Sequence, residues 1–121
     1  MEEMTVTLED YIETILILNK GAGVKINDIA ARLGIKKSSV VASIKRLKKM
    51  NLVEQEFYGR VKLTETGRER AEYVYMKHSI IKEILIKIGV NENRAEKEAC
   101  AIEHFLSNDT LNKILEKLKE K

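Results

Sequence analysis

The chain has 121 residues, of which 44% are hydrophobic and 34% are charged, and its formal net charge is +3. This size predicts one compact domain or two small units, and the apolar content is too high for a disordered protein. We expect no membrane span, because no long apolar stretch is free of charge, and no signal peptide, because the N-terminus is acidic. The one cysteine, Cys100, excludes an intrachain disulfide and favours a reducing cytoplasm.

Two helices are predicted at the start of the chain. Thr7 is a suitable N-cap for a helix that runs to about Lys20, because apolar residues recur there at helical spacing. Asn27 then opens a short helix over residues 28–33, which ends at Gly34, a residue that tolerates positive φ. Ala30 is small enough to let a following helix pack closely. This arrangement predicts the first half of a helix-turn-helix.

A third helix and a hairpin follow. Ser38 or Ser39 is expected to cap the helix, and the apolar residues expected on its buried side are Val40, Val41, Ile44 and Leu47. Residues 52–53 and 61–63 are predicted to form short strands around a turn at Tyr58-Gly59-Arg60. A hairpin directly after the second helix of a helix-turn-helix is a wing. We therefore assign residues 1–70 to a winged helix-turn-helix DNA-binding domain.

Residues 71–121 are expected to form a helical metal-binding and dimerisation domain. Helices are predicted to begin at Thr64 or Thr66 and run to Ile88, to continue over residues 92–106 behind an Asn91 cap, and to finish over residues 109–119. Their apolar faces exceed what one small lobe can bury, which predicts a dimer interface, although core packing alone is the alternative. The expected fold class is mainly α, a winged helix-turn-helix followed by a three-helix dimerisation lobe.

Basic residues gather on the predicted helix-turn-helix. The segment from Ile29 to Val53 contains seven basic residues and no acidic one, a pattern typical of polyanion binding, although a solvated helix face is the alternative. In a winged helix-turn-helix the second helix enters the major groove with its N-terminal residues near the base edges. The candidate DNA-binding residues are Lys36, Lys37, Ser38, Ser39, Ala42, Ser43, Arg46, Lys49 and, on the wing, Arg60. No Asn, Gln or Arg begins this helix, so DNA shape and phosphate spacing are expected to carry part of the specificity.

Several potential metal ligands recur at helical spacing. Asp10 and Glu13 are three residues apart, and Cys100, Glu103 and His104 are spaced i, i+3 and i+4, so each set shares one helix face. Carboxylate, thiolate and imidazole together are ligands for a divalent transition metal. Two alternatives remain. Cys100 is a buried residue with a purely structural role, and Asp10 is a first-turn negative charge that the helix dipole stabilises. The candidate metal ligands are Asp10, Glu13, His78, Cys100, Glu103 and His104.

These motifs together resemble the diphtheria toxin repressor family of metal-dependent transcriptional regulators. The resemblance runs from Thr7 to Leu106 and includes Asp10-Tyr11-Ile12-Glu13, the helix-turn-helix with its wing, Leu63-Thr64-Glu65-Thr66-Gly67-Arg68, His78 and Cys100-Ala101-Ile102-Glu103-His104. It implies a homodimeric repressor of manganese or iron homeostasis genes that binds an operator in double-stranded DNA and needs Mn²⁺ or Fe²⁺. The chain is similar in length to members of the short manganese-regulator branch, which lacks an SH3-like domain.

The ligand set that this resemblance implies is a hybrid. Asp10 and Glu13 match the manganese branch, whereas Cys100 matches the cysteine of the iron branch, where manganese regulators carry a glutamate. A thiolate is softer than a carboxylate and shifts preference from Mn²⁺ toward Fe²⁺, Co²⁺ or Zn²⁺. Lys82 occupies a position where the iron branch has a glutamate of a second metal site, and Glu96 is a candidate to replace another ligand of that site.

The sequence therefore predicts a regulator, not an enzyme, in which a cation bridges the DNA-binding and dimerisation lobes. The first alternative is a metal-independent winged-helix regulator in which Cys100 is structural or redox-sensing. A hydrolytic metalloenzyme is disfavoured because no glycine-rich phosphate loop and no nucleophile-base pair are evident. An RNA-binding module is disfavoured because the chain has only four tyrosines and two phenylalanines for base stacking.

Overall fold

The computed structural model describes residues 6–56 and 59–119, which form two compact units. The first unit runs to Val74 and the second begins at Tyr75, so the boundary falls inside the longest helix. None of the helices in these described ranges is both long and apolar enough to cross a bilayer. The elements in chain order are α1 (Leu8–Leu18), α2 (Ile26–Leu33), α3 (Lys37–Lys49), β1 (Val53–Gln55), β2 (Val61–Leu63), α4 (Glu65–Lys87), α5 (Glu92–Glu103) and α6 (Asn108–Lys119).

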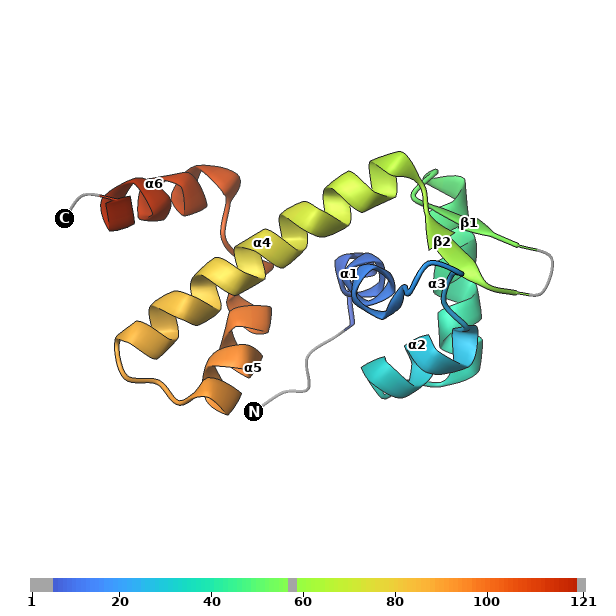
Figure 1. The fold of residues 1–121 in the computed structure, drawn as a ribbon, viewed down its shortest axis with the longest axis horizontal. Coiled ribbons are helices and arrows are strands. Elements are labelled where there is room, and N and C mark those ends of the chain that lie inside the picture. The colour runs from blue at the N-terminus through green and yellow to red at the C-terminus, as the bar shows by residue number, and fades with distance from the viewer. Residues whose placement is uncertain (1–5, 57–58, 120–121) are drawn as a thin grey trace. The chain divides into compact units, whose positions relative to one another are not determined.

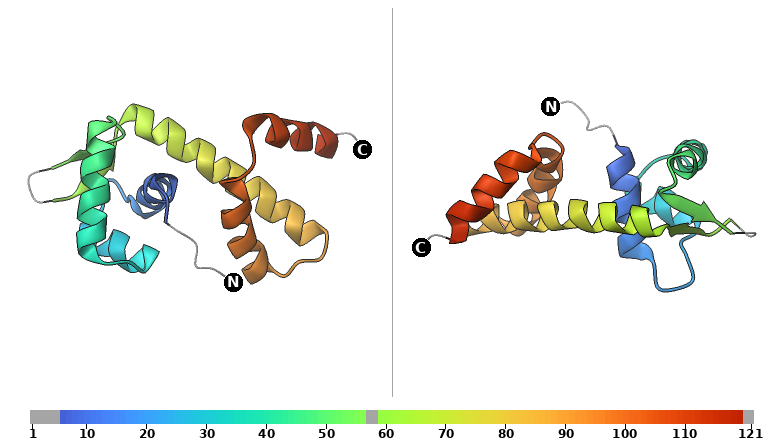
Figure 2. Two further views of the ribbon diagram at one scale, coloured as in Figure 1. Left: turned by 180° about the vertical axis from the view of Figure 1, so that it is seen from behind. Right: turned by 90° about the horizontal axis from the view of Figure 1, so that it is seen from above.

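The first unit is a winged helix-turn-helix, as predicted. Helix α1 contacts α2, α3 and β2, while α3 also contacts α2 and β1 (Figure 1). Strands β1 and β2 pair antiparallel with Val53 opposite Leu63, and Figure 2 shows this hairpin extending away from the three helices. The sequence analysis did not foresee a further bridge, in which Val24 exchanges two backbone hydrogen bonds of 2.8 Å with Val61. This bridge ties the loop before α2 to the wing.

Apolar side chains from all three helices and the wing form the core of the first unit. Complete burial of an aliphatic side chain of this size stabilises a fold by about 1.5–3 kcal/mol. The core therefore holds α3 against α1 and leaves the opposite face of α3 open. The side chains below 2% exposure in this core are Ile12, Ile15, Ile29, Val40, Ile44, Leu47, Val61 and Ala71.

Helix α1 begins and α2 ends as the sequence predicts. Thr7 and Asp10 form a reciprocal capping box, with the Thr7 backbone N–H donating to Asp10 Oδ2 at 2.8 Å. Gly34 ends α2 in the left-handed conformation, at φ +67°.

Three expectations for α2 and α3 were wrong. The N-caps are Lys25 and Lys36 rather than Asn27 and Ser38 or Ser39, so both helices begin earlier than their polar residues suggested. Val41 is 38% exposed because it lies about 100° around α3 from Val40.

The start of α4 is anchored tightly beneath the wing. Thr64 Oγ1 donates to the Asn51 carbonyl at 2.7 Å and accepts from the Gly67 N–H at 3.0 Å. The Thr64 N–H donates to the Leu52 carbonyl, also at 3.0 Å. A Cβ atom on Gly67 would lie 1.9 Å from that same carbonyl oxygen. Only glycine therefore lets α4 approach the chain this closely.

The second unit combines the C-terminal part of α4 with α5 and α6. Asn91 caps α5 as predicted, since its side chain accepts from the Arg94 N–H at 2.9 Å. The helix ends at Glu103, three residues before the expected end, and His104 occupies the C-cap. The Ala95 and Ala99 side chains are fully buried, and their small size suits close packing of helices.

Candidate metal centre and DNA-binding surface

The last turn of α5 gathers three of the six predicted metal ligands. One donor atom from each of Cys100, Glu103 and His104 lies within 4.8 Å of the donor atoms of the other two. The spacing i, i+3 and i+4 produces this arrangement because 3.6 residues make one helical turn. Thiolate, carboxylate and imidazole are thus presented together at one end of the helix.

His78 brings a fourth predicted ligand to the same place from α4. Its Nδ1 atom lies 3.4 Å from Glu103 Oε2, and His104 Nε2 lies 3.8 Å from Glu103 Oε1. Glu103 is therefore flanked by two imidazoles, one from α4 and one from the C-cap residue of its own helix. The sequence alone could not pair His78 with Glu103, because they are 25 residues apart on different helices.

The Glu103 carboxylate fits a metal site by its burial and its partners. The residue is 1% exposed, and among the described residues neither of its carboxylate oxygens accepts a hydrogen bond. A buried carboxylate without hydrogen bonds costs stability unless a positive charge compensates it. The donors around it are nitrogen, sulfur and oxygen, the set preferred by divalent transition metals. These residues therefore fit the kind of cation that their spacing predicted.

Asp10 and Glu13 lie one turn apart on α1, in the first unit. Asp10 belongs to the capping box and is half-buried, whereas Glu13 is 8% exposed, an unusual burial for a carboxylate. Both side chains are held on a helix that packs against α3.

A polar network continues from the other side of His78. Glu96 Oε2 accepts from His78 Nε2 at 2.6 Å, and Glu96 Oε1 lies 3.0 Å from Lys82 Nζ. Burial acts to raise the pKa of Glu96, but the hydrogen bonds from Lys82 and His78 outweigh it and hold that pKa below its usual value. The hydrogen bond to Glu96 in turn raises the pKa of Lys82. The structure thus pairs the two residues that the resemblance connected with a second metal site.

The exposed face of α3 carries the predicted DNA-contacting side chains. This face lies opposite the buried Val40, Ile44 and Leu47. Lys36 caps the helix without a side-chain hydrogen bond among the described residues, which leaves first-turn N–H groups suited to a phosphate. The predicted contact residues that are exposed are Lys36, Lys37, Ser38, Ser39, Ala42, Arg46 and Lys49, and Ser43 is half-buried.

A recess beside this face adds residues that the sequence analysis missed. It lies where the starts of α2 and α3 meet the wing, and it is lined by Lys25, Ile26, Asn27, Lys37 and Gly59. Two of these side chains are cationic, so the recess suits an anion. No local pattern marked Lys25, because only the fold brings it close to Lys37.

The wing carries charged side chains of both signs. Arg60 is half-buried, and its Nη1 donates to the Gly23 carbonyl at 3.4 Å. Lys62 Nζ pairs with Glu56 Oε1 at 2.8 Å. Tyr58, part of the predicted turn, lies outside the described residues.

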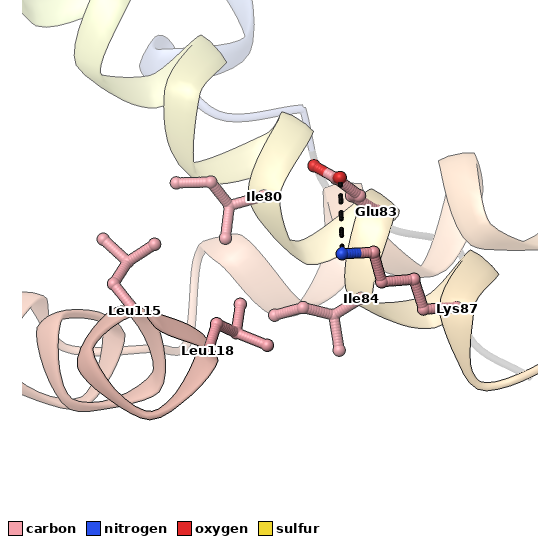
Figure 3. A pocket seen from close by; sticks show the side chains of 6 residues that line it. All are labelled: Ile80, Glu83, Ile84, Lys87, Leu115 and Leu118. Carbon is pink, nitrogen blue, oxygen red and sulfur yellow. Dashed lines mark ion pairs between the residues drawn. The ribbon is translucent and has the colours of Figure 1, made fainter. Parts of the chain in front are cut away.

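Apolar side chains remain exposed on the second unit. A groove between α4 and α6 is lined by Ile80, Ile84, Leu115 and Leu118, with the Glu83–Lys87 ion pair at its edge (Figure 3). Other large apolar side chains of this unit are exposed outside the groove, namely Tyr75, Met76, Ile86, Ile88 and Phe105. Apolar side chains that gather on the surface of a small domain often mark an interaction surface.

Comparison with known proteins identifies both units. Residues 3–61 match the family described as iron dependent repressor, N-terminal DNA binding domain. Residues 64–120 match the family described as iron dependent repressor, metal binding and dimerisation domain.

The similar proteins are transcriptional regulators. An HTH-type transcriptional regulator of Methanocaldococcus jannaschii is 36% identical over 98% of this chain and 99% of its own length. The HTH-type transcriptional regulator MntR of Geobacillus kaustophilus is 33% identical over 91% of this chain and 79% of its own. The crystal structure of T. acidophilum IdeR superposes with a TM-score of 0.84 and 30% identity, covering 97% of this chain and 56% of that protein.

Proposed function

Since the chain belongs to the iron-dependent repressor family, and is thus a metal-dependent DNA-binding transcriptional regulator rather than an enzyme, we propose how its own residues carry out this function. Residues of both units together bind one regulatory divalent cation, Mn²⁺ or Fe²⁺. The proposed ligands are Asp10 and Glu13 from α1, His78 from α4, and Cys100, Glu103 and His104 from the end of α5.

The observation that carries this proposal is the Glu103 carboxylate. It is 1% exposed, accepts no hydrogen bond within the described part of the chain, and lies within 4 Å of two imidazole nitrogens. A purely structural role would leave this carboxylate as a cost to stability. A cation-binding role explains why a thiol and two histidines surround it.

The ligands come from both units, which links the cation to DNA binding. Asp10, Glu13 and Glu103 carry like charges, which would repel one another if the two units met without a cation. A bound divalent cation supplies the positive charge that makes their approach favourable. Because α1 packs on α3, an α1 held by the second unit also holds the recognition helix. In a dimer, two such helices must lie about 34–36 Å apart to enter successive major grooves.

Cys100 sets the preference among metals. Its thiolate stands among carboxylates and imidazoles, so the donor set is softer than one made of oxygen and nitrogen alone. Soft donors favour Fe²⁺, Co²⁺ and Zn²⁺ over Mn²⁺. We expect the chain to respond to Fe²⁺ at least as well as to Mn²⁺.

DNA is bound by the exposed face of α3, with the wing beside it. Ser38, Ser39, Ala42 and Ser43 approach the base edges, while the lysines and arginines bind phosphates. The phosphate-binding set is Lys36, Lys37, Arg46, Lys49 and Arg60. The recess that contains Lys25 and Lys37 supports a phosphate position between α3 and the wing.

We further propose a homodimer that acts as a repressor on an operator in double-stranded DNA in the cytoplasm. The family is one of repressors whose second domain dimerises, and the exposed apolar side chains of α4 and α6 supply a surface for a second copy. Residues 1–70 form the DNA-binding domain and residues 71–121 the metal-binding and dimerisation domain. Its targets are genes of manganese or iron homeostasis.

Fluorescence anisotropy with labelled DNA from upstream of the protein's own gene tests the proposal. Binding is measured in chelator and then with Mn²⁺, Co²⁺ and anaerobic Fe²⁺, beside an unrelated duplex at the same salt concentration. The test variant is Glu103→Gln, and the control is Glu98→Gln, an exposed acid on the same helix whose partner is Arg94.

We expect specific binding only with metal, about tenfold or more weaker binding for Glu103→Gln at the same metal concentration, and no change for Glu98→Gln. Equally tight specific binding in chelator would contradict metal control. It would favour a metal-independent winged-helix regulator with a structural or redox-sensing Cys100. Unchanged metal-dependent binding by Glu103→Gln would contradict the assigned ligands.

A further inference from the structure

Glu96 joins His78 to Lys82 on the side of the imidazole that faces away from Glu103. One carboxylate oxygen, Oε2, lies 2.6 Å from His78 Nε2, and the other, Oε1, lies 3.0 Å from Lys82 Nζ. A third group, Glu92, places its Oε1 3.8 Å from the same ammonium. Glu96, on α5, therefore uses one carboxylate oxygen for His78 and the other for Lys82, both of which lie on α4.

These contacts determine which nitrogen of His78 carries the proton. An ionised carboxylate only accepts hydrogen bonds, so His78 Nε2–H must be the donor in the 2.6 Å contact. In the neutral ring the lone pair then belongs to Nδ1, the atom 3.4 Å from Glu103 Oε2. The ring therefore presents its metal-binding atom to Glu103.

Lys82 strengthens this arrangement in two ways. Its ammonium, 3.0 Å from Oε1, holds the carboxylate in place, although 54% of the Glu96 side chain is exposed. Because the same Glu96 carboxylate contacts both groups, the positive charge of Lys82 also opposes the approach of a second cation to this side of His78.

We propose that Glu96, held by Lys82, is a positioning residue that keeps His78 in the Nε2–H form and directs Nδ1 toward the metal centre. The inference rests on the proposed function, because it takes His78 to be a metal ligand. Partners of this kind orient a ligating imidazole and raise its basicity, and their loss weakens metal binding by about 10–100-fold. Glu96 and Lys82 thus act on the cation without touching it.

The first measurement is made on the metal-free protein. Two histidines are present in the chain, so ¹⁵N imidazole NMR with a His104→Gln reference assigns His78 directly. At a pH where the ring is neutral, the wild-type chain should show protonated Nε2 and unprotonated Nδ1 at His78. Glu96→Ala should give a mixture of the two forms, whereas the exposed Glu98→Ala control should not.

The second measurement is Co²⁺ affinity, read from the absorption spectrum of the bound ion in competition with a chelator. We expect Glu96→Ala to bind Co²⁺ about 10–100-fold more weakly, with a smaller loss for Lys82→Gln. Lys82→Arg retains the positive charge and should restore most of the affinity. Glu98→Ala should match the wild type, and circular dichroism checks that every variant folds.

The outcomes separate this inference from the proposed function. If His78→Ala loses Co²⁺ affinity while Glu96→Ala keeps both the affinity and the His78 proton position, the positioning role is overturned and His78 remains a ligand. If His78→Ala itself leaves Co²⁺ affinity unchanged, His78 is not a ligand and the inference fails with that assignment. If Lys82→Arg is as weak as Lys82→Gln, the charge of Lys82 is not what holds Glu96.

Discussion

Replacement of Glu103 by glutamine should change stability in opposite directions without and with metal. In the metal-free protein the carboxylate is 1% exposed and accepts no hydrogen bond from the described residues. The amide has nearly the same shape, carries no charge and can donate to His78 Nδ1, which lies 3.4 Å from Oε2. We therefore expect Glu103→Gln to stabilise the metal-free fold by about 1–2 kcal/mol.

Bound metal should make the wild type more stable than Glu103→Gln, the reverse of the order expected without metal. A cation at 100 times its dissociation constant stabilises the wild-type fold by about 2.7 kcal/mol. For a chain of this length, that corresponds to a rise in the melting temperature of roughly 10 °C. Glu103→Gln loses the charged ligand at the centre of the site, so the same metal concentration should raise its melting temperature by no more than about 1–2 °C.

Thermal unfolding followed by circular dichroism, with chelator and with Mn²⁺ or Co²⁺, measures both effects. Glu98→Gln, on the exposed face of α5, serves as the control and should behave as the wild type does. A metal-induced rise in Glu103→Gln as large as that of the wild type would refute the reasoning. A metal-free Glu103→Gln less stable than the wild type would show that the buried carboxylate is well compensated without a cation.

Three further predictions concern the start of α4, the DNA surface and the metal preference. Gly67→Ala should destabilise the protein by about 1–3 kcal/mol in urea unfolding, because its Cβ would displace the Leu52 carbonyl, whereas Glu69→Ala should have little effect. Lys37→Ala should weaken binding to all duplexes similarly and reduce the slope of log affinity against log salt concentration by about one, and an unchanged slope would exclude a phosphate contact. Cys100→Ser should weaken Zn²⁺ binding far more than Mn²⁺ binding in chelator competition, since it removes the soft ligand, and equal losses would argue against thiolate ligation.

Local signals in the sequence predicted much of the fold because they act over one helical turn. The Thr7 capping box and the Asn91 cap each join a side chain to a backbone N–H three residues away. Gly34 ends α2 because it adopts a positive φ at low cost. Such contacts form within one segment and need no knowledge of its neighbours.

Packing overrode the local signals at the starts of α2 and α3. Asn27, Ser38 and Ser39 are favourable caps, yet they lie inside the helices, which begin after Lys25 and Lys36. Burial of apolar residues outweighs a cap, since a buried aliphatic side chain contributes about 1.5–3 kcal/mol and a cap about 1 kcal/mol. Ile29 and Val40 are fully buried and belong to these two helices, which begin earlier than predicted.

The candidate metal site likewise combines features that local sequence spacing predicts with contacts that depend on how the helices pack. The sequence by itself determined the ligand types and the grouping of Cys100, Glu103 and His104, because helical periodicity fixes which residues of one helix share a face. Only the tertiary structure decided that His78 faces Glu103 on one side and Glu96 on the other. These contacts join α4 to α5, and their partners are set by how two helices pack, which no spacing within either helix specifies.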